Sequence, residues 1–212
     1  MVAQKGGTGK SLITAHLSVA FCEAGLTVLV VDLDPQANLV KWAKDRPEDA
    51  MPVVIPADPE RLPHVMETAR KEDIGLVIFD TPPHTEKSSL AAIRAADLIV
   101  VPTRPRVFDL QSIGDTVALL NAARRRSSAV ALLNSAKNAR SPVLDEAAEV
   151  IAGFGLEVAP MRILDRDPFA HALTVSKGIT EYEPTGKAAA EIRELMQFLA
   201  GKLGLTLPKT VP

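Results

Sequence analysis

The stretch QKGGTGKS, Gln4–Ser11, decides the fold of this chain. Its glycines let the backbone turn so that successive N–H groups face one concavity, in which a phosphate can sit. Lys10 and Ser11 open the helix that follows, and its N-terminal dipole also favours an anion. The stretch therefore predicts a phosphate-binding loop, and the alternative is a glycine-rich turn that caps a helix without binding anything.

The loop departs at one position from the strict P-loop pattern G-x-x-x-x-G-K-[ST], which has glycine where this chain has Gln4. The rest of the pattern is present. In it the ammonium group of Lys10 reaches the β and γ phosphates of a nucleotide, and the hydroxyl of Ser11 ligates Mg²⁺. A second lysine, Lys5, precedes the glycines, and a plain phosphate loop does not require it.

Downstream of the loop, apolar runs rich in β-branched residues alternate with longer amphipathic segments. The runs are continuously apolar, so both faces of the strands are covered, as in a parallel sheet between helices. The pattern predicts an α/β fold with a doubly wound, mainly parallel sheet flanked by helices. The predicted strands are Thr27–Asp34, Ile74–Asp80, Asp97–Pro102 and Ala129–Asn134. The predicted helices are Lys10–Ala24, Ala37–Asp45, Pro59–Lys71, Lys87–Ala95, Leu110–Ala123, Leu144–Gly153 and Gly186–Leu203.

We expect one P-loop domain over residues 1–203 and a loose tail over 204–212, because no Gly, Ser or Pro-rich linker divides the chain. This fold places a central strand just ahead of the phosphate loop, where the chain has only Met1–Gln4. Either that first strand is very short or the recorded start has lost residues.

Acidic residues follow two of the predicted strands. Asp80 ends the apolar run LVIF, the Walker B arrangement, in which the carboxylate holds Mg²⁺ or its water; the alternative is an N-cap for the next helix. Asp34 ends the earlier strand, next to Pro35, and a carboxylate there can orient a water for attack on the γ phosphate. Asp32 points the same way out of that strand and either assists this role or caps backbone groups.

Together these motifs resemble the ParA/MinD class of P-loop ATPases, closest to the small ParA, or ParF-like, branch of plasmid-partition proteins. KGGTGKS is similar to the deviant Walker A motif of that class, with Lys5 as the signature lysine. VVDLDPQANLVKW, Val30–Trp42, and LVIFDTPP, Leu76–Pro83, are similar to its Asp-Pro-Gln and Walker B segments. AADLIVVPTRPRVFDLQSIG, Ala95–Gly114, resembles the small ParA branch, and the likeness covers nearly the whole chain.

The resemblance implies an ATPase that uses ATP and Mg²⁺ and forms a homodimer with two nucleotides between its subunits. In that class the signature lysine contacts the phosphates of the neighbouring subunit's ATP, which offsets the repulsion between facing nucleotides; the alternative for Lys5 is a solvated loop lysine. Asn134 is expected near the adenine base, unless it is a turn asparagine. The expected catalytic residues are Lys5, Lys10 and Asp34. The expected nucleotide-binding residues are Gly6, Gly7, Thr8, Gly9, Lys10, Ser11, Leu12 and Asn134, and the expected metal ligands are Ser11 and Asp80.

The implied partners are non-specific DNA and a ParB-like adaptor, in partition of plasmid or chromosomal DNA. The net charge of −2 means that DNA must be bound by a local basic patch. The alternative for each basic residue is a solvated surface position without a role in DNA binding. The candidates are Arg124, Arg125, Arg126, Lys137, Arg140, Arg162, Arg166, Lys177, Lys187 and Arg193.

Other functions on the same fold fit the sequence less well. A MinD-like positioning ATPase carries a basic amphipathic C-terminal segment, and GLTLPKTVP has neither its length nor its charge, so no membrane partner is expected. The single cysteine, Cys22, excludes a disulfide within one chain, a Cys-x-x-Cys zinc site and a nitrogenase-type cluster. It also indicates a reducing, cytoplasmic setting, and the resemblance implies association with the nucleoid. A dethiobiotin-type synthetase and a ParA homologue for DNA transfer or conjugation remain alternatives.

Overall fold

The computed structural model describes residues 1–106, 109, 112–137 and 142–208. The chain divides into two compact units. The first unit comprises Met1–Lys10 and Thr81–Asp165, and the second unit comprises Ser11–Asp80 and Arg166–Pro212. The boundary therefore follows Lys10 and Asp80, two residues of the predicted site.

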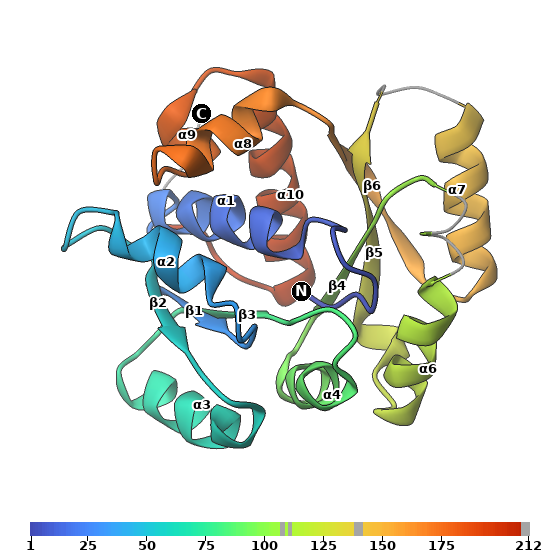
Figure 1. Ribbon diagram of the computed structural model, residues 1–212, viewed down its shortest axis with the longest axis horizontal. Coiled ribbons are helices and arrows are strands. Elements are labelled where there is room, and N and C mark those ends of the chain that lie inside the picture. The colour runs from blue at the N-terminus through green and yellow to red at the C-terminus, as the bar shows by residue number, and fades with distance from the viewer. Residues whose placement is uncertain (107–108, 110–111, 138–141, 209–212) are drawn as a thin grey trace. The chain divides into compact units, whose positions relative to one another are not determined.

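The first unit is built on a parallel three-stranded sheet in the order β4-β5-β6. The N-terminal segment, dark blue in Figure 1, runs beside β4, and the Val2 N–H donates to the Val100 carbonyl at 3.0 Å. Apolar side chains of the sheet and helices share one core with Val2. The elements are α4 (Glu86–Ala95), β4 (Ile99–Thr103), α6 (Ile113–Ala122), a 3-10 helix (Arg126–Ser128), β5 (Ala129–Ala136), α7 (Pro142–Gly153) and β6 (Glu157–Leu164).

The second unit holds another parallel three-stranded sheet, in the order β2-β1-β3. All five residues of β1 are buried, as expected for a central strand with helices over its faces. The elements are α1 (Lys10–Glu23), β1 (Val28–Asp32), α2 (Asn38–Lys44), β2 (Val53–Pro56), a 3-10 helix (Pro59–Arg61), α3 (Leu62–Lys71), β3 (Leu76–Asp80), α8 (Asp167–Thr174), α9 (Ile179–Tyr182) and α10 (Lys187–Leu203). Helix α10 ends where Gly204 adopts a left-handed conformation.

The predicted α/β class with parallel strands is confirmed, and each predicted strand matches an observed one to within a few residues. Two strands, β2 and β6, were not predicted. Both lie at the edge of their sheet and contain a proline, Pro56 or Pro160, which weakens a strand signal in the sequence. In the part of the chain that the structure describes, no helix is both long and apolar enough to span a membrane.

Arg46, in the segment that follows α2, is hydrogen-bonded to α9 and to the segment that precedes it in the second unit. Its guanidinium donates to both carboxylate oxygens of Glu181, at 2.8 and 2.9 Å, and to the carbonyls of Met51 and Ser176, each at 2.9 Å. The guanidinium carbon also lies 4.8 Å from the ring centroid of Trp42. A two-pronged arginine–carboxylate contact of this kind fixes the direction of both side chains.

The buried side chain of His16 connects α1 to the segments around α8 and α9 by hydrogen-bond contacts in the second unit. Its Nδ1 accepts a hydrogen bond from the Ile179 N–H at 3.0 Å, and its Nε2 lies 3.1 Å from the Phe169 carbonyl. Both contacts are satisfied by the neutral imidazole that carries its proton on Nε2. Burial lowers the pKa of His16 to about 4, although the hydrogen bond to Phe169 acts in the opposite direction.

We expect the protein to lose stability as the pH falls below the ordinary range of histidine. The unfolded chain takes up a proton at His16 near pH 6.5, whereas the folded chain does so only near pH 4. The contribution is therefore complete above the unfolded pKa and decreases through this window, by about 3 kcal/mol of unfolding free energy in total. Urea unfolding of wild type and His16→Gln across that window measures it, with the exposed His171→Gln as the control. Equal pH slopes for wild type and His16→Gln would contradict the assignment.

Candidate functional site

The loop between the N-terminal segment and α1 adopts a conformation that requires glycine. Gly7 and Gly9 have φ angles of 71° and 92°, which L side chains rarely adopt. A Cβ on Gly9 would also lie 2.1 Å from Nδ2 of Asn134, so a side chain has no room there. The Asn134 amide, 2% exposed, donates to the Thr8 carbonyl at 2.7 Å. Asn134, which lies on β5, thus connects this strand to the loop by a hydrogen bond.

The two lysines of the loop have different surroundings in the first unit. Lys10 is 6% exposed, and its ammonium donates to the carbonyls of Ala3 at 3.1 Å and Lys5 at 3.4 Å, so it lies over the loop. The side chain of Lys5 is 35% exposed, and its ammonium lies 2.6 Å from Oδ1 of the buried Asp109. The ammonium of Lys10 therefore contacts its own loop, whereas the ammonium of Lys5 contacts Asp109.

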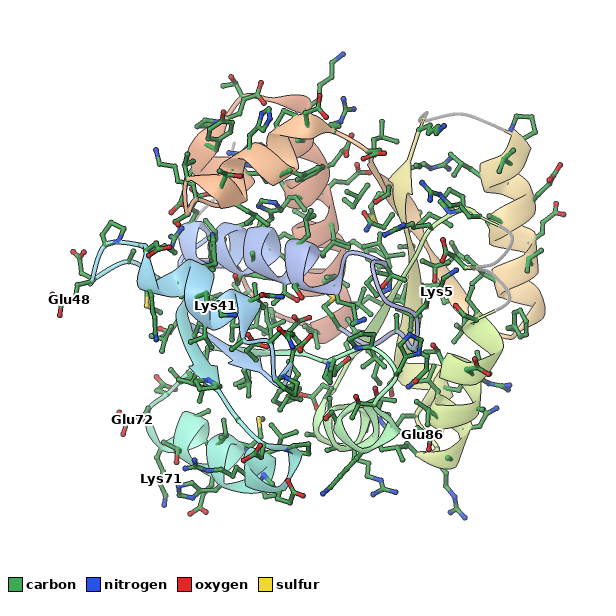
Figure 2. The ribbon with its side chains drawn as sticks, in the orientation of Figure 1. Lys5, Lys41, Glu48, Lys71, Glu72 and Glu86 are labelled. Carbon is green, nitrogen blue, oxygen red and sulfur yellow. The ribbon has the colours of Figure 1, made fainter. Side chains whose placement is uncertain are left out.

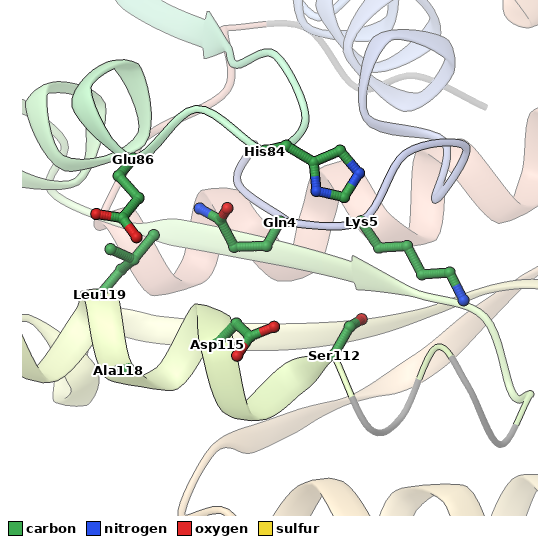
Figure 3. Close-up of a pocket in the computed structure, with 8 residues that line it drawn as sticks. All are labelled: Gln4, Lys5, His84, Glu86, Ser112, Asp115, Ala118 and Leu119. Atoms are coloured by element: carbon green, nitrogen blue, oxygen red, sulfur yellow. The ribbon is translucent and has the colours of Figure 1, made fainter.

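A cleft of about 450 Å³ opens beside Lys5 in the first unit. Figure 3 shows Asp115 on α6, and Ser112 just before it, facing the segment that bears Gln4 and Lys5. The Gln4 carbonyl accepts a hydrogen bond at 3.0 Å from the N–H of His84, which has a left-handed backbone with φ of 55°. The remaining lining residues are Glu86, Ala118 and Leu119. The segment after Asp80 is therefore attached to the residue that precedes the loop.

In the second unit, Ser11 and Asp80 form a short hydrogen-bonded pair. The Ser11 hydroxyl donates to Oδ2 of Asp80 at 2.6 Å, and the Thr14 hydroxyl reaches Oδ1 at 3.5 Å. Asp80 ends β3, is 1% exposed, and pairs in register with Asp32 of β1. A buried carboxylate beside a hydroxyl is a set of hard oxygen donors suited to Mg²⁺, which takes few protein ligands and keeps water and phosphate oxygens.

Asp32 caps backbone groups, which is one of its two predicted roles. Its carboxylate accepts from the N–H groups of Asp34 at 3.0 Å, Leu39 at 3.1 Å and Val40 at 3.4 Å, at the start of α2. Burial raises the pKa of Asp32, although these N–H donors favour its charged form. The residue shapes the turn that presents Asp34, and its oxygens are occupied by that task.

Asp34 lies in the turn that follows β1, at the same edge of the sheet as Asp80. Its Oδ1 accepts the Gln36 N–H at 2.9 Å, and its backbone carbonyl accepts the Ala37 N–H at 2.8 Å. The side chain is partly exposed, in contrast to Asp32 and Asp80. A carboxylate held by its own turn and open to solvent can contact a water molecule.

Each unit by itself fits part of a nucleotide with Mg²⁺: the loop of the first unit fits phosphate groups, and Ser11 with Asp80 of the second unit fits the metal ion. The loop backbone turns at Gly7 and Gly9, Lys10 supplies a cation over the loop, and the Thr8 hydroxyl is buried with no hydrogen-bond partner among the described residues. Ser11 and Asp80 supply the oxygen donors for the metal ion. Bound Mg²⁺ would neutralise phosphate charge and polarise the terminal phosphate.

The structure places most of the predicted site residues on these two sets of contacts. In the first unit, Asn134 on β5 contacts the loop that contains Gly6, Gly7, Thr8, Gly9 and Lys10; the second unit contains Ser11, Leu12, Asp34 and Asp80. The base contact of Asn134 stays a prediction, since its amide is seen on the loop carbonyl. Sequence reasoning missed Asp109 as the partner of Lys5. Asp109 was visible only as part of the segment Ala95–Gly114, which carried a resemblance without a role for each residue.

Comparison with known proteins also indicates a nucleotide-binding protein. The family described as CobQ/CobB/MinD/ParA nucleotide binding domain matches residues 1–176. The chromosome-partitioning ATPase Soj of Thermus thermophilus is 27% identical over an alignment of 233 positions with gaps, which covers 94% of this chain and 94% of that one. The maintenance of carboxysome distribution protein A of Gloeobacter kilaueensis is 37% identical over 115 residues, 53% of this chain and 51% of that one. The septum site-determining protein MinD of Pyrococcus horikoshii, solved with Mg-ADP, has the same fold, with a TM-score of 0.72, 22% identity and coverage of 96% and 95%.

Proposed function

Because the chain belongs to the CobQ/CobB/MinD/ParA nucleotide-binding family and is a P-loop ATPase of the ParA/MinD class, we propose that it drives partition of DNA as an ATP-dependent dimer. With ATP and Mg²⁺ bound, two copies associate and hold DNA without sequence preference. A ParB-like adaptor on the cargo stimulates hydrolysis, which returns the protein to monomers. The likeness to a chromosome-partitioning ATPase over 94% of the chain supports this function.

The two halves of the motif have complementary tasks in this proposal. Backbone N–H groups of the loop and the Lys10 ammonium bind the phosphates, and the helix that begins at Lys10 adds its dipole. Ser11 and Asp80 hold Mg²⁺. Asp34 orients the attacking water, and phosphoryl transfer asks little more of a protein than such positioning and charge neutralisation.

The observation that carries the proposal is the position of Lys5. Its ammonium is directed away from its own loop to Asp109, and the side chain is 35% exposed, beside the cleft in Figure 3. A cation placed outside its own phosphate loop can serve the nucleotide of a second copy. In a dry interface with two facing nucleotides such a cation reduces the repulsion between them.

Replacing Lys5 by alanine tests the proposed function. We expect wild type to dimerise with ATP and Mg²⁺ and then to bind duplex DNA, with an affinity that falls as salt rises. Lys5→Ala should keep ATP binding as a monomer, raise the dimer dissociation constant at least about tenfold, and lose DNA binding in parallel. Analytical ultracentrifugation and DNA co-sedimentation measure the two effects.

Lys71→Ala is the matched control for Lys5→Ala. Lys71 projects from the end of α3 (Figure 2), is exposed, and pairs only at the surface with Glu67 at 2.7 Å. It should behave as wild type. A dimer of unchanged strength in Lys5→Ala would refute the role of Lys5 across the interface, and a wild type that stays monomeric with saturating ATP would refute the function itself.

The candidate DNA contacts separate by their surroundings. Arg125 donates to the carbonyls of Ala96 and Asp97, and Arg166 pairs with Glu191 at 2.7 Å, so these two are engaged within the fold. Arg140 lies outside the described residues. The exposed candidates, which we propose for phosphate contacts, are Arg124, Arg126, Lys137, Lys177 and Lys187.

A second candidate function is the positioning of a protein assembly instead of DNA. The local identity of 37% to a carboxysome distribution protein favours it. Both functions use the same ATP cycle, and they differ in the cargo that carries the adaptor. Stimulation of ATP turnover by a centromere-bound adaptor would favour partition, whereas stimulation by a protein-shell adaptor without cognate DNA would favour positioning.

A further inference from the structure

Arg104 lies against the phosphate loop, although no motif points to it. It directly follows β4, at the carboxyl end of a parallel strand, where ligands bind in folds of this class. The register pairs Thr103 with Leu133, so Arg104 and Asn134 follow on neighbouring strands at the same edge. Asn134 contacts the loop at Thr8 and Gly9, and Arg104 approaches it at Gly7.

The approach of Arg104 to the loop is close. A Cβ on Gly7 would lie 2.6 Å from Nη2 of Arg104, which is shorter than real Cβ contacts allow. The φ of 71° at Gly7 excludes most side chains by itself, and the close contact shows that the end of the Arg104 side chain lies against the loop backbone. The guanidinium lies where an anion held by the Gly7 backbone would be within its reach.

Arg104 is incompletely satisfied by the protein itself. Its Nε is buried and has no hydrogen-bond partner among the described residues. A buried donor without an acceptor costs free energy, and such groups in native proteins usually have a reason. The Nε atoms of Arg46, Arg125 and Arg193 are buried in the same way, and Arg104 is set apart from them by lying against the phosphate loop, where an acceptor could arrive with a ligand.

The charge balance around the loop leaves a need for such a cation. Asp109 lies 2.6 Å from the Lys5 ammonium and offsets its charge, so Lys5 adds little positive potential to its own loop. Lys10, together with the Mg²⁺ proposed at Ser11 and Asp80, then faces a triphosphate that carries several negative charges. A guanidinium supplies parallel N–H donors that match two phosphate oxygens at once, which an ammonium group does not.

We propose that Arg104 is a phosphate-binding residue, which contacts the phosphate chain of the nucleotide held by the loop of its own subunit. The inference rests on the proposed function, because it needs a nucleotide at the loop. It gives the segment after β4 two tasks: Arg104 serves the nucleotide in its own subunit, and Asp109 holds the lysine intended for the other.

Equilibrium binding of ATP and ADP to Arg104→Ala tests this role. We expect affinity for ATP to fall about ten- to hundredfold, with Arg104→Lys intermediate, since an ammonium keeps the charge and loses the paired donors. A larger loss for ATP than for ADP assigns the contact to the γ phosphate, and equal losses assign it to the inner phosphates; both outcomes support the proposal. Arg106→Ala, at an exposed neighbouring arginine, is the matched control.

The same measurements separate the ways in which the inference can fail. Thermal unfolding without nucleotide shows whether each variant folds, and Arg104→Gln, which retains much of the side-chain volume, decides the matter if the alanine variant does not. An ATP affinity of folded Arg104→Ala or Arg104→Gln equal to that of Arg106→Ala would overturn the proposal. If wild type bound no ATP, the proposed function would fail before this inference was reached.

Discussion

Lys10→Ala is expected to abolish detectable binding of ATP. The Lys10 ammonium is almost wholly buried and lies over the loop, on the carbonyls of Ala3 and Lys5. In the proposed complex it exchanges these neutral acceptors for phosphate oxygens, and charge-assisted hydrogen bonds are the stronger kind. Removal of a buried partner of this type leaves phosphate charge uncompensated, so we expect the affinity to fall at least about 100-fold.

Isothermal titration with ATP and Mg²⁺ measures this effect, with Lys71→Ala as the surface control. Lys10→Ala also leaves two loop carbonyls without their donor, so the unfolding temperature without nucleotide should be recorded beside the affinity. ATP affinity near that of wild type in a folded Lys10→Ala variant would show that the loop is not the phosphate site. The Arg104 and Lys5 inferences would then fail with it.

The second large effect is expected at Asp34, where alanine should stop turnover and leave the ATP-bound dimer intact. The Asp34 carboxylate follows β1 at the sheet edge that Asp80 shares, and it is partly exposed, whereas Asp32 and Asp80 are buried. Removing a group that positions or activates the attacking water should reduce the rate constant for hydrolysis by about 10²- to 10⁴-fold. Phosphate release under saturating ATP measures the rate, and ultracentrifugation confirms the dimer.

Asp34→Asn separates the chemistry of Asp34 from its place in the turn. Asparagine can still accept the Gln36 N–H that Asp34 accepts at 2.9 Å, so the turn is kept and the charge is lost. We expect Asp34→Asn to turn over ATP as slowly as Asp34→Ala, and the exposed Asp45→Asn to be unaffected. Normal turnover in either Asp34 variant would move the water-orienting role to another residue.

Much of the fold could be predicted from the sequence because its central strands are buried on both faces. The continuous apolar runs around β1 and β4 predicted these strands and their parallel arrangement. Helix α10 showed a one-sided apolar pattern and ended as predicted. The edge strand β6 alternates buried and exposed residues irregularly around Pro160, so its sequence carries little strand signal, and only pairing with β5 identifies it.

The candidate site likewise combines features that consecutive residues predict with contacts between residues that are far apart in the sequence. The amino-acid sequence alone predicted a phosphate loop at residues 4–11, because turn, lysine, hydroxyl and helix start are properties of consecutive residues. Only the tertiary structure decided that Asp109 pairs with Lys5, that Asn134 braces the loop and that Arg104 covers Gly7. These partners lie about a hundred residues from the loop along the chain. They meet it through the strands that precede them, and which strands become neighbours is set by packing of the whole core and not by any short stretch.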